Sequence, residues 1–202
     1  MTSILLVRHG NTEAVGEFLV SRLPGYPLDE RGRAEAESLA TALSPLKLTA
    51  VHSSPLQRAK QTATAIAAPH GIAVFESEAL TDVDFGQWNG LAIADLEADA
   101  AFRRFNQHRA LCAIPKGERV SRIQARMVDA LAEIVQAHPD GIVVVVSHGD
   151  PIRLAVAFYL GLAVDHCQRL EIGTGSVTAL ELNDTDAKLL TLNASNADVL
   201  GR

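Results

Sequence analysis

Two histidines in this 202-residue chain are each followed by a glycine and each preceded by a short apolar run. His9 lies in Arg8-His9-Gly10, and His148 lies in Ser147-His148-Gly149. A neutral imidazole nitrogen can act as a nucleophile or can move a proton. A glycine beside it lets a ligand approach the backbone closely. The pair therefore indicates a site at which one ligand meets two histidines.

A second arginine stands where its charge is unfavourable. Ser54 as N-cap, Pro55 at the first helical position and Gln57 completing a capping box predict a helix start, with Arg58 in its first turn. The helix dipole disfavours a cation there by roughly 0.3–1 kcal/mol. A bound anion would account for this arginine, and a helix N-terminus itself attracts anions. Together with Arg8 it offers two planar guanidinium groups that suit phosphate oxygens.

Transfer of a phosphoryl group from an alcohol also needs an acid that protonates the leaving oxygen. The segment 81–86 supplies two carboxyls, Asp82 and Asp84, beside the aromatic residues Phe85 and Trp88. Apolar surroundings raise the pKa of such a carboxyl toward neutrality. Spacing alone does not choose between the two aspartates, and either one also suits a turn or a helix cap.

Two buried strands are expected to position these groups. Residues 4–7 and 142–146 are short, unbroken runs rich in β-branched side chains, as in the centre of a parallel sheet covered on both faces. Ligands of open parallel sheets bind beyond the carboxyl ends of the strands. We therefore expect His9 and His148, which directly follow these runs, to converge on one crevice.

Apolar residues recur at helical spacing between and after these strands. The stripes cover residues 36–43, 56–67 and 120–134. A further helix is predicted with Asp150 as N-cap, Pro151 at its first position and Gly161 at its end. Alternating strands and helices predict an α/β fold, a three-layer α/β/α arrangement around a mainly parallel sheet.

The last third of the chain is richer in strand patterns. Residues 170–172, 177–182 and 188–192 are predicted as strands, and the turn-rich segment 183–186 joins the last two. One of them is expected to lie antiparallel near an edge of the sheet. Neither a repeat nor a linker interrupts the pattern, so residues 1–202 are interpreted as one domain.

Composition excludes several classes of function. A net charge of −6 and a pI near 5.6 argue against a nucleic-acid or membrane surface, so an anion site must be a local positive pocket. Cys112 and Cys167 match neither a zinc spacing nor a disulfide-rich scaffold. With no signal peptide and no apolar stretch of membrane-spanning length, the chain is expected in the cytoplasm with two reduced thiols.

Five segments taken in order resemble the histidine phosphatase superfamily, and more narrowly its phosphoglycerate-mutase-like branch. They are Arg8-His9-Gly10-Asn11-Thr12, residues 53–59, Asp84-Phe85-Gly86-Gln87-Trp88, Pro115-Lys116-Gly117-Glu118 and Ser147-His148-Gly149. A lone Arg-His-Gly is a weak signal, whereas five ordered motifs between about Leu5 and Leu182 are a strong one. The resemblance implies the phosphoglycerate-mutase-like fold.

The resemblance also implies roles for these residues. His9 is the nucleophile that becomes phosphorylated, and Arg8, Arg58 and His148 form the phosphate pocket, with no metal and no cofactor. The acid of the family lies three positions before the phenylalanine of Asp-Phe-Gly, which is Asp82 here. Asp84 then becomes a structural aspartate and the second choice for the acid. A backbone hydrogen bond near Gly10 is expected to fix the tautomer of His9.

Two positions depart from the family pattern. Relatives usually carry glutamate in place of Asp82, and commonly an asparagine that contacts phosphate in place of Val15. Asn11, Thr12 and the backbone of Gly149 are expected to bind the phosphate instead. The segment 22–28 is expected to form a rim of the pocket.

These inferences predict a phosphatase that hydrolyses a phosphomonoester of a small metabolite. The alternatives are a phosphoglycerate-mutase-type phosphotransferase and a non-catalytic phosphate-binding regulatory module. A metal site is disfavoured because two arginines at the same spot would repel a cation. The expected partner is a small phosphorylated metabolite, with no nucleic acid and no membrane. The substrate and the oligomeric state, a homodimer included, stay open.

Overall fold

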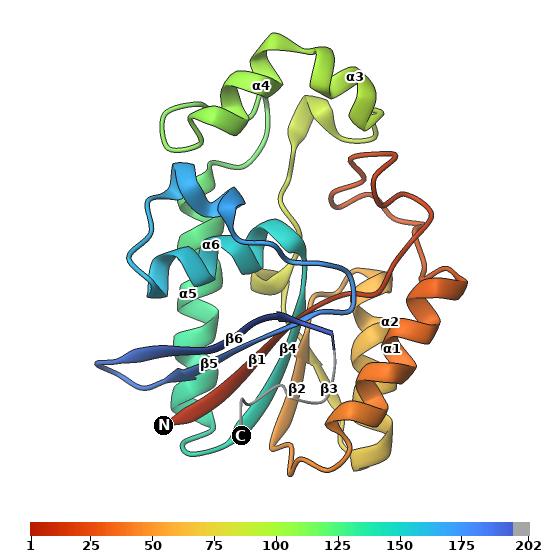
Figure 1. The fold of residues 1–202 in the computed structure, drawn as a ribbon, viewed down its shortest axis with the longest axis vertical. Helices are drawn as coiled ribbons and strands as arrows, with labels where there is room; N and C mark the ends of the chain where they lie inside the picture. Colours follow the sequence, from red (N-terminus) through yellow and green to blue (C-terminus); the bar gives the residue numbers. More distant parts are fainter. Residues whose placement is uncertain (196–202) are drawn as a thin grey trace.

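A six-stranded mixed sheet forms the centre of the computed structural model, which describes residues 1–195 (Figure 1). The strands are β1 (Thr2–Arg8), β2 (Ala50–Ser53), β3 (Val74–Glu76), β4 (Ile142–Ser147), β5 (Val177–Leu182) and β6 (Ala187–Ala194). They lie in the order β3-β2-β4-β1-β5-β6. Neighbours from β3 to β1 pair in parallel, and β5 pairs antiparallel with both β1 and β6. The prediction of a mainly parallel sheet with one antiparallel strand near its edge is confirmed.

The two apolar runs form the neighbouring central strands β1 and β4. Every side chain of residues 4–7 and 143–146 is buried, because alternate residues pack into cores on opposite faces of the sheet. The parallel register pairs Val7 with Val146 and Arg8 with Ser147. His9 and His148 consequently follow the two strands at the same level.

Helices cover both faces of this sheet (Figure 1). α1 (Glu30–Leu43) and α2 (Gln57–Ala67) pack on one face, and α5 (Val120–Ala137) and α6 (Gly149–Tyr159) pack on the other. α3 (Ile93–Ala98) and α4 (Ala100–Gln107) lie beyond the end of the sheet that carries the two histidines. The remaining helical turns are η1 (Ala68–His70), η2 (Glu78–Leu80), η3 (Gly86–Trp88) and η4 (Val164–Arg169). Within residues 1–195 no helix has both the length and the apolar character that crossing a bilayer requires.

Two predicted helix starts are wrong. Leu56 occupies the N-cap position of α2 and has no side-chain cap, because the Ser54 hydroxyl instead contacts His148 Nε2 at 2.8 Å. His148 occupies the N-cap position of α6, and Asp150 lies inside its first turn. The Asp150 carboxylate accepts hydrogen bonds from Arg109 and Arg153. The Asp150 side chain is used in these contacts rather than in capping, whereas the Ser54 hydroxyl contacts His148 and also accepts from Leu56 N.

One predicted strand is absent from the described residues, and two short ones were not predicted. Residues 170–172 follow η4 without joining the sheet, and the carbonyl of Ile172 accepts a hydrogen bond from Arg8 instead. β2 and β3 have only four and three residues, too few for a recognisable pattern.

The loop after β1 is held by a close backbone approach to the first turn of α1. A Cβ atom on Gly32 would lie 2.0 Å from the carbonyl oxygen of Asn11, and one on Gly10 would lie 2.4 Å from the carbonyl oxygen of Gly32. Asp29 strengthens the contact, since its carboxylate accepts from both Gly32 N and Asn11 Nδ2. These glycines therefore fix the loop that carries His9.

Substitution Gly32→Ala is expected to lower the free energy of unfolding by about 1–3 kcal/mol, because the methyl group has to displace backbone atoms. Urea denaturation measures this change. Gly173→Ala is the matched control, since a Cβ there would meet only the Asn193 side chain at 3.4 Å. Equal stability of the two variants would contradict the close approach.

Candidate active site

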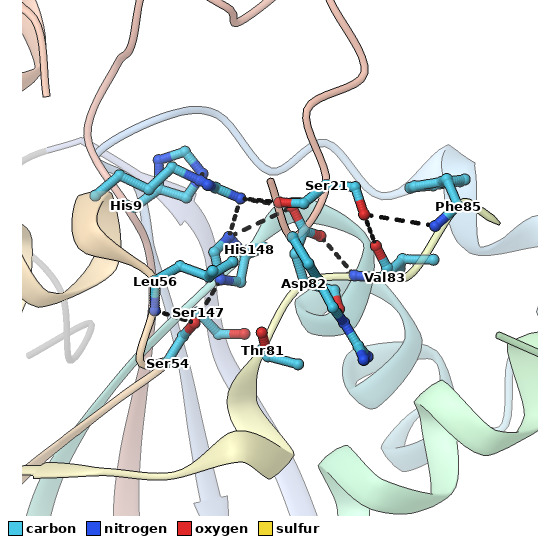
Figure 2. A network of polar contacts seen from close by, with 12 residues as sticks. His9, Ser21, Ser54, Leu56, Thr81, Asp82, Val83, Phe85, Ser147 and His148 are labelled. Atoms are coloured by element: carbon cyan, nitrogen blue, oxygen red, sulfur yellow. Dashed lines mark hydrogen bonds and ion pairs between the residues drawn. The ribbon is translucent and has the colours of Figure 1, made fainter. Parts of the chain in front are cut away.

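The two histidines meet beyond the ends of β1 and β4 (Figure 2), and both contact the guanidinium of Arg58. Their ring centroids lie 5.1 Å apart, and the residues are only 4% and 1% exposed. Arg58 Nε donates to His9 Nε2 at 3.1 Å, and Arg58 Nη2 lies 3.2 Å from His148 Nδ1. The structure thus brings together these predicted site residues from β1, α2 and β4.

Hydrogen bonding fixes which nitrogen of His9 carries the proton. Nδ1 lies 2.7 Å from the carbonyl oxygen of Gly10, which only accepts, so Nδ1 is the protonated nitrogen. Nε2 faces a guanidinium N–H and keeps its lone pair. Burial, followed by the charges of Arg58 and Arg8, holds the pKa of His9 well below its usual value. His9 is therefore a neutral imidazole whose Nε2 is unprotonated and keeps its nucleophilic lone pair, which accepts a hydrogen bond from Arg58.

His148 has the opposite tautomer. Its Nδ1 faces Arg58, which only donates, so the proton resides on Nε2 and is donated to Ser54 Oγ at 2.8 Å. The same hydroxyl accepts from Leu56 N at 3.3 Å. Burial, then the charges of Arg58 and His9, lowers the pKa of His148 well below its usual value. Ser54, which the sequence analysis assigned to a helix cap, orients this histidine.

Asp82 is the aspartate that reaches the site. Its Oδ2 lies 2.9 Å from Arg58 Nη2 and 3.5 Å from His148 Nδ1, and its Oδ1 accepts from Val83 N at 2.8 Å. Burial raises the pKa of the Asp82 carboxyl, and the charge of Arg58 opposes this rise. Asp82 is thus a carboxyl inside the pocket whose neutral form is favoured by burial.

Asp84 lies in a turn, and its pKa is shifted in the opposite direction from that of Asp82. Its Oδ1 accepts from Gly86 N and from Asn89 Nδ2, both at 2.9 Å. The hydrogen bond from Gly86, followed by that from Asn89, lowers the pKa of Asp84. A carboxylate held in its charged form is a poor proton donor.

Arg8 is a half-buried cation with one nitrogen that has no hydrogen-bond partner in the described structure. Its Nη1 donates to the carbonyl of Ile172 at 2.7 Å, whereas its Nε is buried and finds no partner among the described residues. Burial, then the charge of Arg153, lowers the pKa of Arg8. A Cβ on Gly149, at the start of α6, would lie 3.5 Å from this Nε. A guanidinium beside a helix N-terminus favours a bound anion.

Asn11 and Thr12 differ in what they can offer a ligand. The Asn11 side chain is already engaged, because it donates to Asp29 Oδ2 at 2.6 Å and to the Thr12 carbonyl at 3.3 Å. The Thr12 hydroxyl is buried and has no partner within residues 1–195. Thr12 therefore keeps a free polar group for a ligand, while Asn11 anchors its own loop.

Ser21 is a site residue that sequence reasoning missed. Its carbonyl oxygen accepts from Arg58 Nη2 at 2.7 Å, and its hydroxyl donates to the Val83 carbonyl and accepts from Phe85 N. The residue adopts φ of 52°, a left-handed conformation that a lone serine gives no reason to expect. It ties the chain before the predicted rim to the segment that carries Asp82.

The predicted rim segment 22–28 borders a cavity beside Arg58. Part of segment 22–28 lines a cavity of about 380 Å³ that also contacts Arg58 and Lys60.

No group of three or more metal-ligating side chains occurs in the part of the chain described, and both cysteines are free thiols.

Burial of two neutral histidines makes stability depend on pH. Their folded-state pKa values lie below the unfolded value of about 6.5, so the folded state binds fewer protons than the unfolded state below that pH. The free energy of unfolding is then largest above about pH 6.5. It should fall by about 1.4 kcal/mol per pH unit for each histidine as the pH decreases further.

Urea denaturation at pH 7.5 and 5.5 measures this slope, and His148→Asn should reduce it. The pKa of His52 is also lowered by burial and by His138, but it contributes equally to both proteins. An unchanged slope in the variant would show that His148 is protonated in the folded state.

Comparison with known proteins identifies the family of this chain. The model of the histidine phosphatase superfamily (branch 1) matches residues 4–195. Phosphoserine phosphatase 1 of Hydrogenobacter thermophilus is 28% identical over 197 residues, 96% of this chain and 92% of that protein. The 2,3-bisphosphoglycerate-dependent phosphoglycerate mutase of Thermoplasma acidophilum is 27% identical over 199 residues, 96% and 93% of the two chains.

Solved structures agree with the sequence relatives. A mycobacterial glucosyl-3-phosphoglycerate phosphatase superposes with a TM-score of 0.85 at 30% identity, covering 95% of this chain and 98% of the other. The match over nearly the whole length includes the strands, the helices and the pocket of two histidines and two arginines. The chain belongs to the histidine phosphatase superfamily and has its phosphoglycerate-mutase-like fold.

Proposed function

We propose that this chain is a single-domain, metal-independent phosphatase that hydrolyses a phosphomonoester of a small metabolite through a phosphohistidine on His9. The observation that carries the proposal is the unprotonated Nε2 of a buried, neutral His9, whose lone pair accepts a hydrogen bond from Arg58. Similarity to enzymes named as phosphatases supports it.

The first step uses the charges of the pocket. Arg8 and Arg58 bind the phosphate oxygens, and His148 joins them once the bound phosphate has brought a proton to its Nδ1. His9 Nε2 attacks phosphorus in line with the ester oxygen. A nitrogen–phosphorus bond forms while the phosphorus–oxygen bond breaks. The two guanidinium groups stabilise the charge that develops on the transferring group. The Gly10 carbonyl stabilises the N–H opposite the attacking nitrogen, whose ring gains positive charge.

Asp82 supplies the proton that the leaving alkoxide needs. Its position against Arg58 and His148, together with its raised pKa, favours it over Asp84. The resulting carboxylate then takes a proton from a water molecule that attacks the phosphohistidine. Inorganic phosphate leaves, His9 returns to its neutral form and Asp82 is protonated again, so the cycle closes without another reactant.

The expected ligand is a small phosphorylated metabolite rather than a nucleic acid. Similar proteins are named for phosphoserine, glucosyl-3-phosphoglycerate and α-ribazole phosphatase activities, and the net charge of −6 disfavours a polyanion. Two free thiols support a reducing compartment such as the cytoplasm.

Replacement of the nucleophile tests the central step. With a radiolabelled phosphomonoester and a chelator present, the wild type should form an acid-labile, base-stable phosphoenzyme that His9→Ala does not form. The expected loss of turnover in the variant is at least about 1000-fold, as for other nucleophiles. Full activity of His9→Ala would overturn the proposal, and loss of the wild-type phosphoenzyme on chelation would overturn its independence of metal.

A phosphoglycerate-mutase-type reaction is the second candidate, because a named mutase is 27% identical to this chain. Hydrolysis is favoured because η3 is followed after only four residues by α3, leaving no room for the long basic insertion typical of the mutases that this chain resembles. A non-catalytic module is disfavoured because His9 and both arginines are retained.

An assay on 3-phosphoglycerate separates the two reactions. A phosphatase releases inorganic phosphate faster than it forms 2-phosphoglycerate, and His9→Ala supplies the background rate. Isomer formation faster than phosphate release would identify the chain as a mutase.

A further inference from the structure

The Pro115-Lys116-Gly117-Glu118 motif has no part in the mechanism above, yet it packs directly on the segment that carries Asp82. Glu118 N donates to the Asp84 carbonyl at 2.9 Å, and Gln87 N donates to the Pro115 carbonyl at 2.9 Å. A Cβ on Gly117 would lie 2.5 Å from the Asp84 carbonyl oxygen. The motif therefore needs glycine there to bring two backbones together.

This contact places the Glu118 carboxylate between two arginines. Its Oε2 lies 2.7 Å from Arg22 Nη2, and its Oε1 accepts from Arg126 Nε at 2.9 Å. A third hydrogen bond joins Arg126 Nη2 to Oε2 at 3.2 Å. Arg22 belongs to the rim segment, whereas Arg126 belongs to the long helix α5. One carboxylate thus aligns guanidinium groups from two separate elements.

Both arginines also hold the backbone at Asp82 through hydrogen bonds. Arg22 Nε donates to the Asp82 carbonyl at 2.7 Å, and Arg126 Nη2 donates to the same oxygen at 3.1 Å. Arg126 Nη1 donates to the carbonyls of Thr81 and Ala79 at 2.8 and 2.7 Å. The Asp82 carbonyl therefore accepts hydrogen bonds both from the rim segment and from α5.

Backbone position matters more for Asp82 than it would for a longer acid. An aspartate has one methylene between the backbone and its carboxyl, so it cannot compensate for a backbone shift by changing rotamer as a glutamate can. Displacement of a reacting group by about 1 Å can lower a rate about 100-fold. The clamp formed by Arg22, Glu118 and Arg126 is placed to prevent such a shift.

We propose that Glu118, through Arg22 and Arg126, is a positioning residue that holds the Asp82 carboxyl at the leaving-group oxygen. This inference rests on the proposed function, in which Asp82 is the proton donor. Glu118 itself does not contact the two histidines or Arg58 in the described structure. Its role is to set the geometry of proton transfer rather than to bind phosphate.

Leaving groups of different basicity test the proposal. A 4-nitrophenyl phosphate needs little protonation of its leaving group, whereas an alkyl phosphate that the wild type hydrolyses needs nearly complete protonation. Glu118→Gln keeps the size of the side chain and removes its charge. It should lower kcat/KM about tenfold for the alkyl ester and less than twofold for the nitrophenyl ester, because kcat/KM reports the phosphorylation step.

Glu76→Gln is the matched control, since it removes the charge of a glutamate paired with Lys60 at 3.4 Å on β3, outside the clamp. It should leave both substrates unchanged. Arg22→Gln tests the clamp from its other end and should give the same selective loss at about threefold. Circular dichroism and thermal melting of each variant establish that it is folded, and Arg22→Gln decides the question if Glu118→Gln does not fold.

Asp82→Asn separates failure of this inference from failure of the proposed function. A selective loss on the alkyl ester in Asp82→Asn without one in folded Glu118→Gln or Arg22→Gln would overturn the clamp alone. Equal losses on both substrates in Asp82→Asn would instead remove Asp82 as the proton donor. Equal losses on both substrates in the clamp variants would show a merely structural ion pair.

Discussion

The buried guanidinium of Arg58 is the interaction on which the pocket depends. It is 2% exposed and donates to His9, to Asp82 and to the Ser21 carbonyl, while it also faces His148. A guanidinium has donors only, so each imidazole must turn a lone pair toward it. One permanent charge thereby sets the tautomers of both histidines, and burial followed by this charge lowers both of their pKa values.

Burial explains why an acid can exist beside these neutral bases, and the charge of Arg58 limits the effect. Burial of Asp82 favours its protonated form, and Arg58 counteracts part of that effect. Nucleophilic attack requires a neutral histidine, and protonation of the leaving group requires a protonated carboxyl, which a raised pKa favours. The pocket obtains them from one arginine and from burial, and the hydrogen bonds of the Gly10 carbonyl and Ser54 hydroxyl complete the arrangement.

Sequence patterns predicted the features that depend on long apolar runs. β1, β4, the stripes of α1 and α5 and the antiparallel strand near the edge follow from burial and periodicity, and they are confirmed. The wrong helix starts share one cause, because Ser54 and Asp150 have capping chemistry that tertiary partners use instead. The spacing of neighbouring residues does not predict those partners, because they are distant in the sequence.

The site could be predicted only where the residue type is itself informative. His9, His148, Arg8 and Arg58 were named from their types and positions. The spacing left Asp82 and Asp84 open and the family resemblance selected Asp82, a choice that the burial of Asp82 and the hydrogen bonds of Asp84 support. Ser21 acts through its backbone carbonyl, which every residue has. The partners of Glu118 lie 96 residues before it and 8 residues after it, and no spacing indicates that they meet.

The parallel pairing of β1 with β4 also decides where this chain can change its length. Inserting or deleting one residue within either strand would turn its apolar side chains to the opposite face and shift one histidine against the other. A segment between the strands that carries no paired strand and none of the reacting groups bears no such constraint, since closing a longer loop costs only about 0.6 kcal/mol per doubling. The α3–α4 segment can therefore gain or lose residues while the reacting groups keep their spacing.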